Sequence, residues 1–81
     1  MKALVYVTMK KTVLDPQGAT IARALNSLGH AEINAVRQGK YFEIELADGI
    51  SREQAATELN RIAAEVLSNP VIEEYRVEIA G

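Results

Sequence analysis

Few side chains in this sequence are able to carry out covalent catalysis. The sequence contains no cysteine and a single histidine, His30, so a thiol nucleophile is excluded and any Ser/His/Asp arrangement would have to use His30. No serine lies in a G-x-S-x-G turn: Ser27 and Ser68 fall near predicted helix ends, and Ser51 is explained by helix capping. Because His30 directly follows a glycine that ends a predicted helix, we interpret it as an exposed loop residue.

Sites for metals, nucleotides and nucleic acids have no clear pattern either. One histidine and no cysteine exclude a Cys/His zinc site, and the five glycines are isolated rather than gathered in a phosphate-binding loop. The formal net charge of −2 argues against a nucleic-acid partner, which would require a concentrated basic surface. We therefore expect this chain to bind no cofactor and no metal.

Two basic residues, Arg37 and Lys40, flank a Gln-Gly pair in what we predict to be the turn of a hairpin. They could contact a partner or a phosphate, or they could simply keep a charged turn in solvent, which is the interpretation that the sequence alone favours. Gly39 would then supply a backbone conformation that other residues resist.

The elements that would position these residues begin with a strand and a helix. Residues 3–9 are rich in β-branched and aromatic residues and predict a strand with both faces largely covered. Asp15 and the proline after it predict a helix start, and Gly29 predicts its end after about residue 28. Ile21, Leu25 and Leu28 are spaced by four and three residues, which predicts one buried stripe along this helix.

The second half of the chain repeats strands and a helix. Residues 31–46 predict two antiparallel strands joined by a tight turn at Gly39. Ser51 and Gln54 fit a capping box that opens a second helix, which the Asn-Pro pair at 69–70 ends, and residues 72–79 predict a last strand. The order β-α-β-β-α-β predicts an α+β fold, a two-layer sandwich with a mainly antiparallel four-stranded sheet and two helices on one face.

Length and hydropathy bear on the state of the protein. Eighty-one residues suffice for one domain over 1–81, and so short a chain gains stability by association, so we expect a homo-oligomer. The apolar stretches are too short to span a bilayer and no signal-peptide pattern is present, which predicts a cytoplasmic protein without membrane contact.

Three segments together point to a family. Residues 13–18 (VLDPQG), 36–41 (VRQGKY, with Glu43 after them) and 69–75 (NPVIEEY) resemble the signature segments of the PurS family. They occur in family order and spacing, so the resemblance covers essentially the whole chain. It implies partner-interface candidates within these segments, namely Asp15, Arg37, Gly39, Lys40, Asn69 and Pro70.

The resemblance also implies a function. PurS proteins are homodimer-forming, non-catalytic small subunits of phosphoribosylformylglycinamidine synthase in de novo purine biosynthesis. In that complex a glutaminase subunit releases ammonia from glutamine, and a synthetase subunit uses ATP and magnesium to form the amidine. The small subunit would bridge the two and support ammonia transfer, and it would hold no cofactor of its own.

A second class of function is compatible with the predicted fold. Two-layer β-α-β-β-α-β units often dimerise and hold a small effector at their interface, as ligand-binding regulatory domains. A domain of that kind usually shows a glycine-lined ligand loop, which this sequence lacks. Because of this lack and of the resemblance to the PurS family, we favour the assembly subunit over the regulatory domain.

Overall fold

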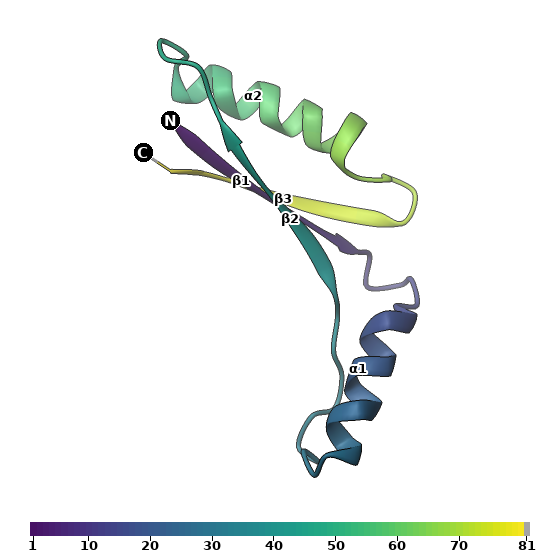
Figure 1. Ribbon diagram of the computed structural model, residues 1–81. Coiled ribbons are helices and arrows are strands. Elements are labelled where there is room, and N and C mark those ends of the chain that lie inside the picture. The colour runs from purple at the N-terminus through teal and green to yellow at the C-terminus, as the bar shows by residue number, and fades with distance from the viewer. Residues whose placement is uncertain (81) are drawn as a thin grey trace.

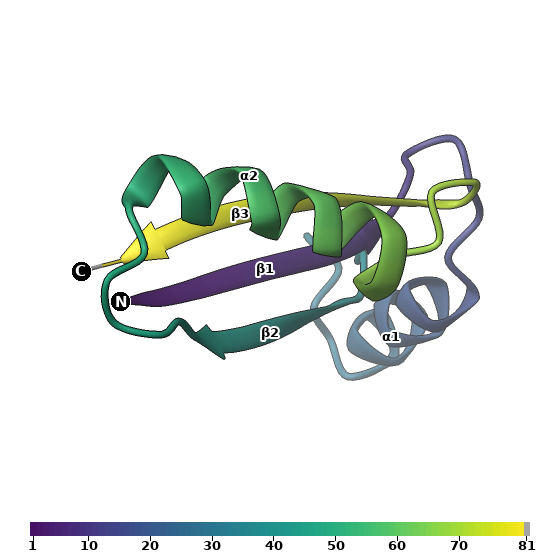
Figure 2. The same ribbon diagram turned by 90° about the horizontal axis from the view of Figure 1, so that it is seen from above.

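The computed structural model of the protein describes residues 1–80 and contains one three-stranded antiparallel sheet with two α-helices. The elements are β1 (Lys2–Met9), α1 (Pro16–Ser27), β2 (Gly39–Glu45), α2 (Arg52–Ile62), a π-helical turn η1 (Ala63–Leu67) that continues α2, and β3 (Glu73–Ala80). Figure 1 shows the arrangement of these elements. The strand order is β2-β1-β3, and Figure 2 shows β1 between the other two strands. Within this described range no helix is long and apolar enough to cross a membrane.

The core lies between β1 and α2. Ala3, Val5 and Val7 of β1 are buried, and they pack with partly buried side chains of β2 and β3 against Ala55, Leu59 and Ala63. Figure 2 shows α2 lying along the sheet above β1 and β3. The other face of β1, with Tyr6 at its middle, is only partly buried, so the prediction that both faces are largely covered holds for one face.

Both helix starts follow the capping residues in the sequence. Asp15 is the N-cap of α1 and its Oδ1 accepts a hydrogen bond of 3.0 Å from the Gly18 amide. Ser51 is the N-cap of α2, where its Oγ accepts a bond of 3.1 Å from the Gln54 amide. The predicted helix end near residue 28 is also confirmed, because α1 stops at Ser27 and Gly29 adopts the left-handed φ of 100°.

The predicted hairpin around Gly39 is wrong. Residues 31–38 form no strand, and Gly39 is the first residue of β2 rather than a turn. The reason is that residues 31–38 run back beside α1, where the Asn26 side-chain amide donates to the carbonyls of His30 and Ile33 at 2.8 and 3.1 Å. The sheet therefore has three strands instead of the predicted four.

Only α2 covers the sheet within one chain. Figure 1 shows α1 lying beyond the end of the sheet instead of on its face, so the predicted layer of two helices is not formed by a single copy. The chain is accordingly elongated, 51 × 27 × 14 Å with a radius of gyration of 16.2 Å, whereas a compact domain of this length has about 12 Å. As a result the stripe predicted to be buried on α1 is largely open to solvent: Leu28 is 76 % exposed and Ile21 38 %, while Leu25 is partly buried.

Candidate functional site

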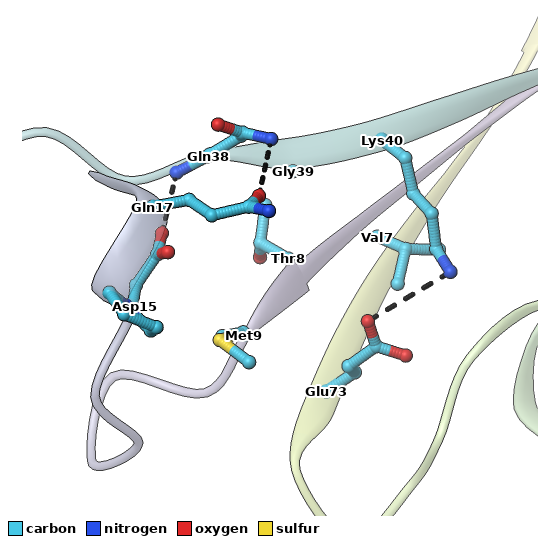
Figure 3. A pocket seen from close by; sticks show the side chains of 10 residues that line it. Val7, Thr8, Met9, Asp15, Gln17, Gln38, Gly39, Lys40 and Glu73 are labelled. Atoms are coloured by element: carbon cyan, nitrogen blue, oxygen red, sulfur yellow. Dashed lines mark hydrogen bonds and ion pairs between the residues drawn. The ribbon is translucent and has the colours of Figure 1, made fainter. Parts of the chain in front are cut away.

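The three segments that carry the family resemblance meet at one end of the sheet. The end of β1, the start of α1, the start of β2 and the start of β3 surround a pocket of about 340 Å³ (Figure 3). Asp15, Gln38, Lys40 and Glu73 line it together with neighbouring residues. We call this region, formed by residues 7–18, 36–41 and 69–75, the junction.

Asp15 is the buried charged side chain of the junction, 7 % exposed. Its Oδ2 accepts a 2.7 Å hydrogen bond from the Gln38 amide, while its Oδ1 accepts the bond that caps α1. The Gln38 amide, and after it the Gly18 amide, lowers the pKa of Asp15 below its ordinary value of 3.8 against the opposing effect of desolvation, and the charge of Arg37 adds to the lowering. Both oxygens of this interface candidate are thus engaged inside the chain.

Two glycines allow the backbones of the junction to approach closely. A Cβ on Gly18 would lie 2.1 Å from the Val36 carbonyl oxygen. A Cβ on Gly39 would lie 2.6 Å from both the Val7 carbonyl oxygen and the Thr8 Cγ2. Since the positive φ angles among residues 1–80 belong to Gly29 and Gly49, the expectation that Gly39 supplies a special turn conformation is wrong, and its role is steric.

Arg37 braces the loop between β1 and α1. Its Nη2 donates to the carbonyls of Met9 and Lys10 at 3.1 and 2.8 Å, and its Nη1 donates to the Val13 carbonyl at 3.2 Å. A guanidinium can serve several acceptors at once because its donors have a fixed fork geometry. Neither of the two roles weighed for Arg37 from the sequence included this internal bracing, which spans 24 to 28 residues.

Lys40 and Glu73 face each other across the pocket, as Figure 3 shows. The Lys40 Nζ lies 4.0 Å from the Glu73 Oε2, and 56 % of the Lys40 side chain is exposed. Glu73 Oε1 also accepts a 2.7 Å bond from the Asn69 amide, and Asn69 Oδ1 accepts one of 3.1 Å from the Val71 amide. Pro70, between them, is exposed.

The structure therefore divides the six candidates. Asp15, Gly39 and Lys40 line the pocket, Arg37 lies behind it, and Asn69 and Pro70 form the turn that leads to Glu73. Sequence reasoning did not single out Gln17 and Gln38, whose side chains join through a 2.7 Å hydrogen bond on the pocket wall (Figure 3). Their signal was their place within the first and second family-like segments.

The chemistry of the junction is that of a packed corner with a polar surface. The Asp15 and Glu73 carboxylates accept hydrogen bonds from backbone amides, and Glu73 also faces Lys40. In the part of the chain that the structure describes, no three His, Cys, Asp or Glu residues are grouped to hold a metal ion. The arrangement fixes the relative positions of β1, α1, β2 and β3, and it presents Lys40 and the exposed Asn-Pro turn to solvent.

Comparison with known proteins decides the family. The family model described as PurS, phosphoribosylformylglycinamidine (FGAM) synthase, matches residues 2–81. The chain belongs to the PurS family. The family membership inferred from the three segments is thereby confirmed, and the match extends over nearly the whole sequence.

Individual relatives agree with this assignment. The phosphoribosylformylglycinamidine synthase subunit PurS of Mycobacterium leprae is 45 % identical over 76 residues, which is 94 % of this chain and 91 % of that protein. The crystal structure of Methanocaldococcus jannaschii PurS, described as a subunit of formylglycinamide ribonucleotide amidotransferase, superposes with a TM-score of 0.84 at 36 % identity, covering 95 % of this chain and 92 % of that one. A chain in the structure of PurLQS from Thermotoga maritima gives 0.78 at 33 % identity, covering 95 % and 93 %. The PurS fold, an antiparallel sheet with two helices, is thus shared with solved structures.

Proposed function

We propose that this chain is the non-catalytic small subunit of phosphoribosylformylglycinamidine synthase, acting in the cytoplasm in de novo purine biosynthesis. The observation that carries the proposal is the PurS family match over residues 2–81. The absence of cysteine and of a glycine-rich phosphate loop from the sequence supports a role in assembly instead of glutamine hydrolysis or nucleotide binding.

In this role the subunit bridges two catalytic partners. A separate glutaminase releases ammonia from glutamine, and a separate synthetase uses ATP and magnesium to convert the formylglycinamide ribonucleotide to its amidine. The bridge holds the two close enough for ammonia to pass between them. The name of the Thermotoga maritima complex, PurLQS, in which a chain with this fold occurs, supports a multi-subunit assembly.

Reconstitution tests this function. The partner glutaminase and synthetase from the same organism are combined with ATP, magnesium and formylglycinamide ribonucleotide, with and without the chain. We expect amidine formation from glutamine to require the chain, while formation from added ammonium salts requires the synthetase alone. Full glutamine-dependent activity in its absence would contradict the proposed bridging role, as would glutamine hydrolysis by the pure chain.

A second copy of the chain is part of the proposal. On the α1 face, Ile21 and Leu28 are 38 % and 76 % exposed and Leu25 is only partly buried. Phe42 and Ile44 of β2 lie on the α2 side of the sheet and are only partly buried. An uncovered apolar helix and an uncovered part of a sheet face in the same small chain favour association with another copy.

The flank of α2 extends the same uncovered surface. Arg52 marks the flank of α2 toward β3, because its Nη1 donates to the Ile79 carbonyl at 3.2 Å. At about 3.6 residues per turn, Ile62 lies about 80° around the helix from Arg52, at the other edge of the buried stripe that contains Ala55 and Leu59, and it is 36 % exposed. We propose that α1 of a second copy lies in this trough beside α2 and over β2. It would complete the two-helix layer that the sequence predicts.

Substitutions on α1 test the dimer. The pair Ile21→Asp and Leu28→Asp places carboxylates on the proposed contact, so we expect sedimentation at micromolar concentration to show a monomer where the unaltered chain shows a dimer. Thr20→Asp with Ser27→Asp, both exposed and about 100° around α1 from the apolar stripe, is the matched control and should remain dimeric. A dimer that persists in the double variant would refute the docking of α1.

A further inference from the structure

No helix or loop within residues 1–80 packs on one of the two faces of the sheet. This face consists of Lys2, Leu4, Tyr6 and Thr8 of β1 together with the residues opposite them in β2 and β3. Helix α2 packs on the other face, on Ala3, Val5 and Val7, and α1 lies past the end of the sheet (Figure 1). We call this surface the open face; none of its residues is buried.

The centre of the open face is a preformed aromatic cluster. Tyr6 stands opposite Tyr41 on one side and Arg76 on the other. The two tyrosine rings are stacked with centroids 6.1 Å apart, and the Arg76 guanidinium lies 4.5 Å from the centre of the Tyr6 ring. Tyrosine and arginine held in this way lose little conformational entropy on binding, and they are the residue types that dominate binding energy in protein interfaces.

The charges around this centre are mostly negative. The open face carries four negatively charged residues, the glutamates at 43, 45, 74 and 78, and two positively charged ones, Lys2 and Arg76. Glu43 pairs with Lys2 at 3.5 Å between Oε2 and Nζ, and Glu78 pairs with Arg76. Glu45 and Glu74 have no ion pair within residues 1–80. The open face thus carries a negative surplus that two exposed carboxylates leave unmatched.

This charge argues against a second copy as the occupant. Packing two open faces against each other would bring glutamates toward glutamates, and like charges across an interface disfavour it. The uncovered apolar surface for a second copy, on α1, β2 and α2, also lies apart from the open face. The occupant that matches the open face is therefore a protein surface of the opposite sign.

We propose that the open face docks a basic surface of another protein, with arginine or lysine side chains that pair with Glu45 and Glu74 around an apolar centre that packs on Tyr6 and Tyr41. The inference rests on the proposed function in one respect, because it takes that protein to be a catalytic subunit of the same synthase. It assigns which face of the small subunit meets a catalytic partner.

Binding to the purified glutaminase and synthetase tests the proposal. The chain is immobilised and its Kd for the two partners, offered together, is measured at about 50 and about 300 mM NaCl. We expect the double variant Glu45→Lys with Glu74→Lys to weaken binding about tenfold or more at low salt, with a smaller loss at high salt, because like charges then face each other. Tyr41→Ala should weaken binding about tenfold at both salt concentrations.

The matched control carries the same charge change on α2, which packs on the opposite face of the sheet. Glu53→Lys with Glu58→Lys, both exposed, should bind like the unaltered chain, and circular dichroism and sedimentation should show all variants folded with the same oligomeric state. Equal Kd values for the open-face variants and the control would overturn this inference alone. A smaller oligomer for Tyr41→Ala would also overturn it, since the open face would then be a contact between copies. If the unaltered chain binds neither partner, the proposed function fails together with this inference.

Discussion

The Asp15 carboxylate accepts a 2.7 Å hydrogen bond from the backbone amide of Gln38, 23 residues further along the chain. Its other oxygen caps α1 through the Gly18 amide. One buried side chain therefore joins the first turn of α1 to the residue before β2. Helix α1 does not pack on the sheet of its own chain, so this contact fixes the direction of α1 relative to the sheet. It thereby also positions the apolar face of α1 that we propose to contact a second copy.

The stability that Asp15 provides should depend on pH. Its folded-state pKa is lowered, chiefly by the Gln38 amide, so its contribution is fully present above the ordinary pKa of 3.8 that it has in the unfolded chain and is lost as the pH falls through the lower folded value. We expect Asp15→Ala to lower the thermal midpoint by several degrees at pH 7. The difference in thermal midpoint between the variant and the unaltered chain should become smaller below about pH 4.

Thermal unfolding of the two proteins at several pH values between 7 and 3 measures this effect. Glu53→Ala, exposed in the first turn of α2, is the carboxylate control and should give a gap much smaller than that of Asp15. A gap for Asp15→Ala that stays constant down to pH 3 would contradict a stabilising carboxylate at this position.

The helices and their ends were the most predictable part of the fold, because their signals are local. Asp15 and Ser51 cap their own helices within three residues, and such contacts can be inferred from sequence spacing. The register of a strand and the surface on which a helix packs depend on residues far away in the sequence. Residues 31–38 contain the apolar side chains of a strand, but they lie along α1, so a hairpin with an internal turn was predicted where the structure has one strand.

The candidate site was predictable only as a set of segments. All six candidate residues fall in or beside the junction, because the segments that resemble the family are the ones that the fold brings together. Their individual roles were not predictable, since Arg37 acts on carbonyls 24 to 28 residues away and no short-range spacing encodes such contacts. Gly39 was interpreted as a turn residue because a close approach between two backbones leaves the same signal, a lone glycine.

Gly18 offers a test in which the expected sign is reversed. Replacing a glycine by alanine inside a helix usually stabilises it by about 1 kcal/mol. Here the added Cβ would lie 2.1 Å from the Val36 carbonyl oxygen, so we expect Gly18→Ala to destabilise the chain by about 1 to 3 kcal/mol, the range for overpacking. Urea unfolding measures it, and Ser27→Ala, at the exposed end of the same helix, should be neutral or slightly stabilising. A stabilised Gly18→Ala would exclude the close contact.

Two substitutions at Gly39 separate its steric role from a turn role. Asparagine tolerates the left-handed backbone of turns better than alanine does, so a turn glycine would accept Asn more readily than Ala. In the structure any Cβ at this position would lie 2.6 Å from the Val7 carbonyl oxygen, and we expect both variants to lose stability, with Asn no better than Ala. Urea midpoints decide between the two, and a well-tolerated Gly39→Asn would restore the turn interpretation.

Arg37 and Lys40 belong to the same family-like segment, but their structural surroundings predict different defects. Arg37 donates to three carbonyls of the loop after β1, so Arg37→Ala should destabilise the chain by about 1 kcal/mol or more, the usual effect of losing hydrogen bonds from a charged group. Lys40 makes a 4.0 Å ion pair with Glu73 and is half exposed, and its Nζ lies 5.9 Å from the centre of the Phe42 ring. Exposed contacts of both kinds contribute about 0 to 1 kcal/mol. Lys40→Ala should therefore leave the thermal midpoint nearly unchanged.

Comparing stability with activity completes this test. If Lys40 meets a partner, Lys40→Ala should lower amidine formation from glutamine in the reconstituted complex while its thermal midpoint is kept. Arg37→Lys should fall between Arg37→Ala and the unaltered chain in stability, because an ammonium group cannot reproduce the guanidinium fork. Arg23→Ala, on the exposed side of α1, is the control for loss of a positive charge. An Arg37→Ala variant as stable as this control would show that the bonds to the loop contribute nothing. Full glutamine-dependent activity of Lys40→Ala would make Lys40 an ordinary solvated residue.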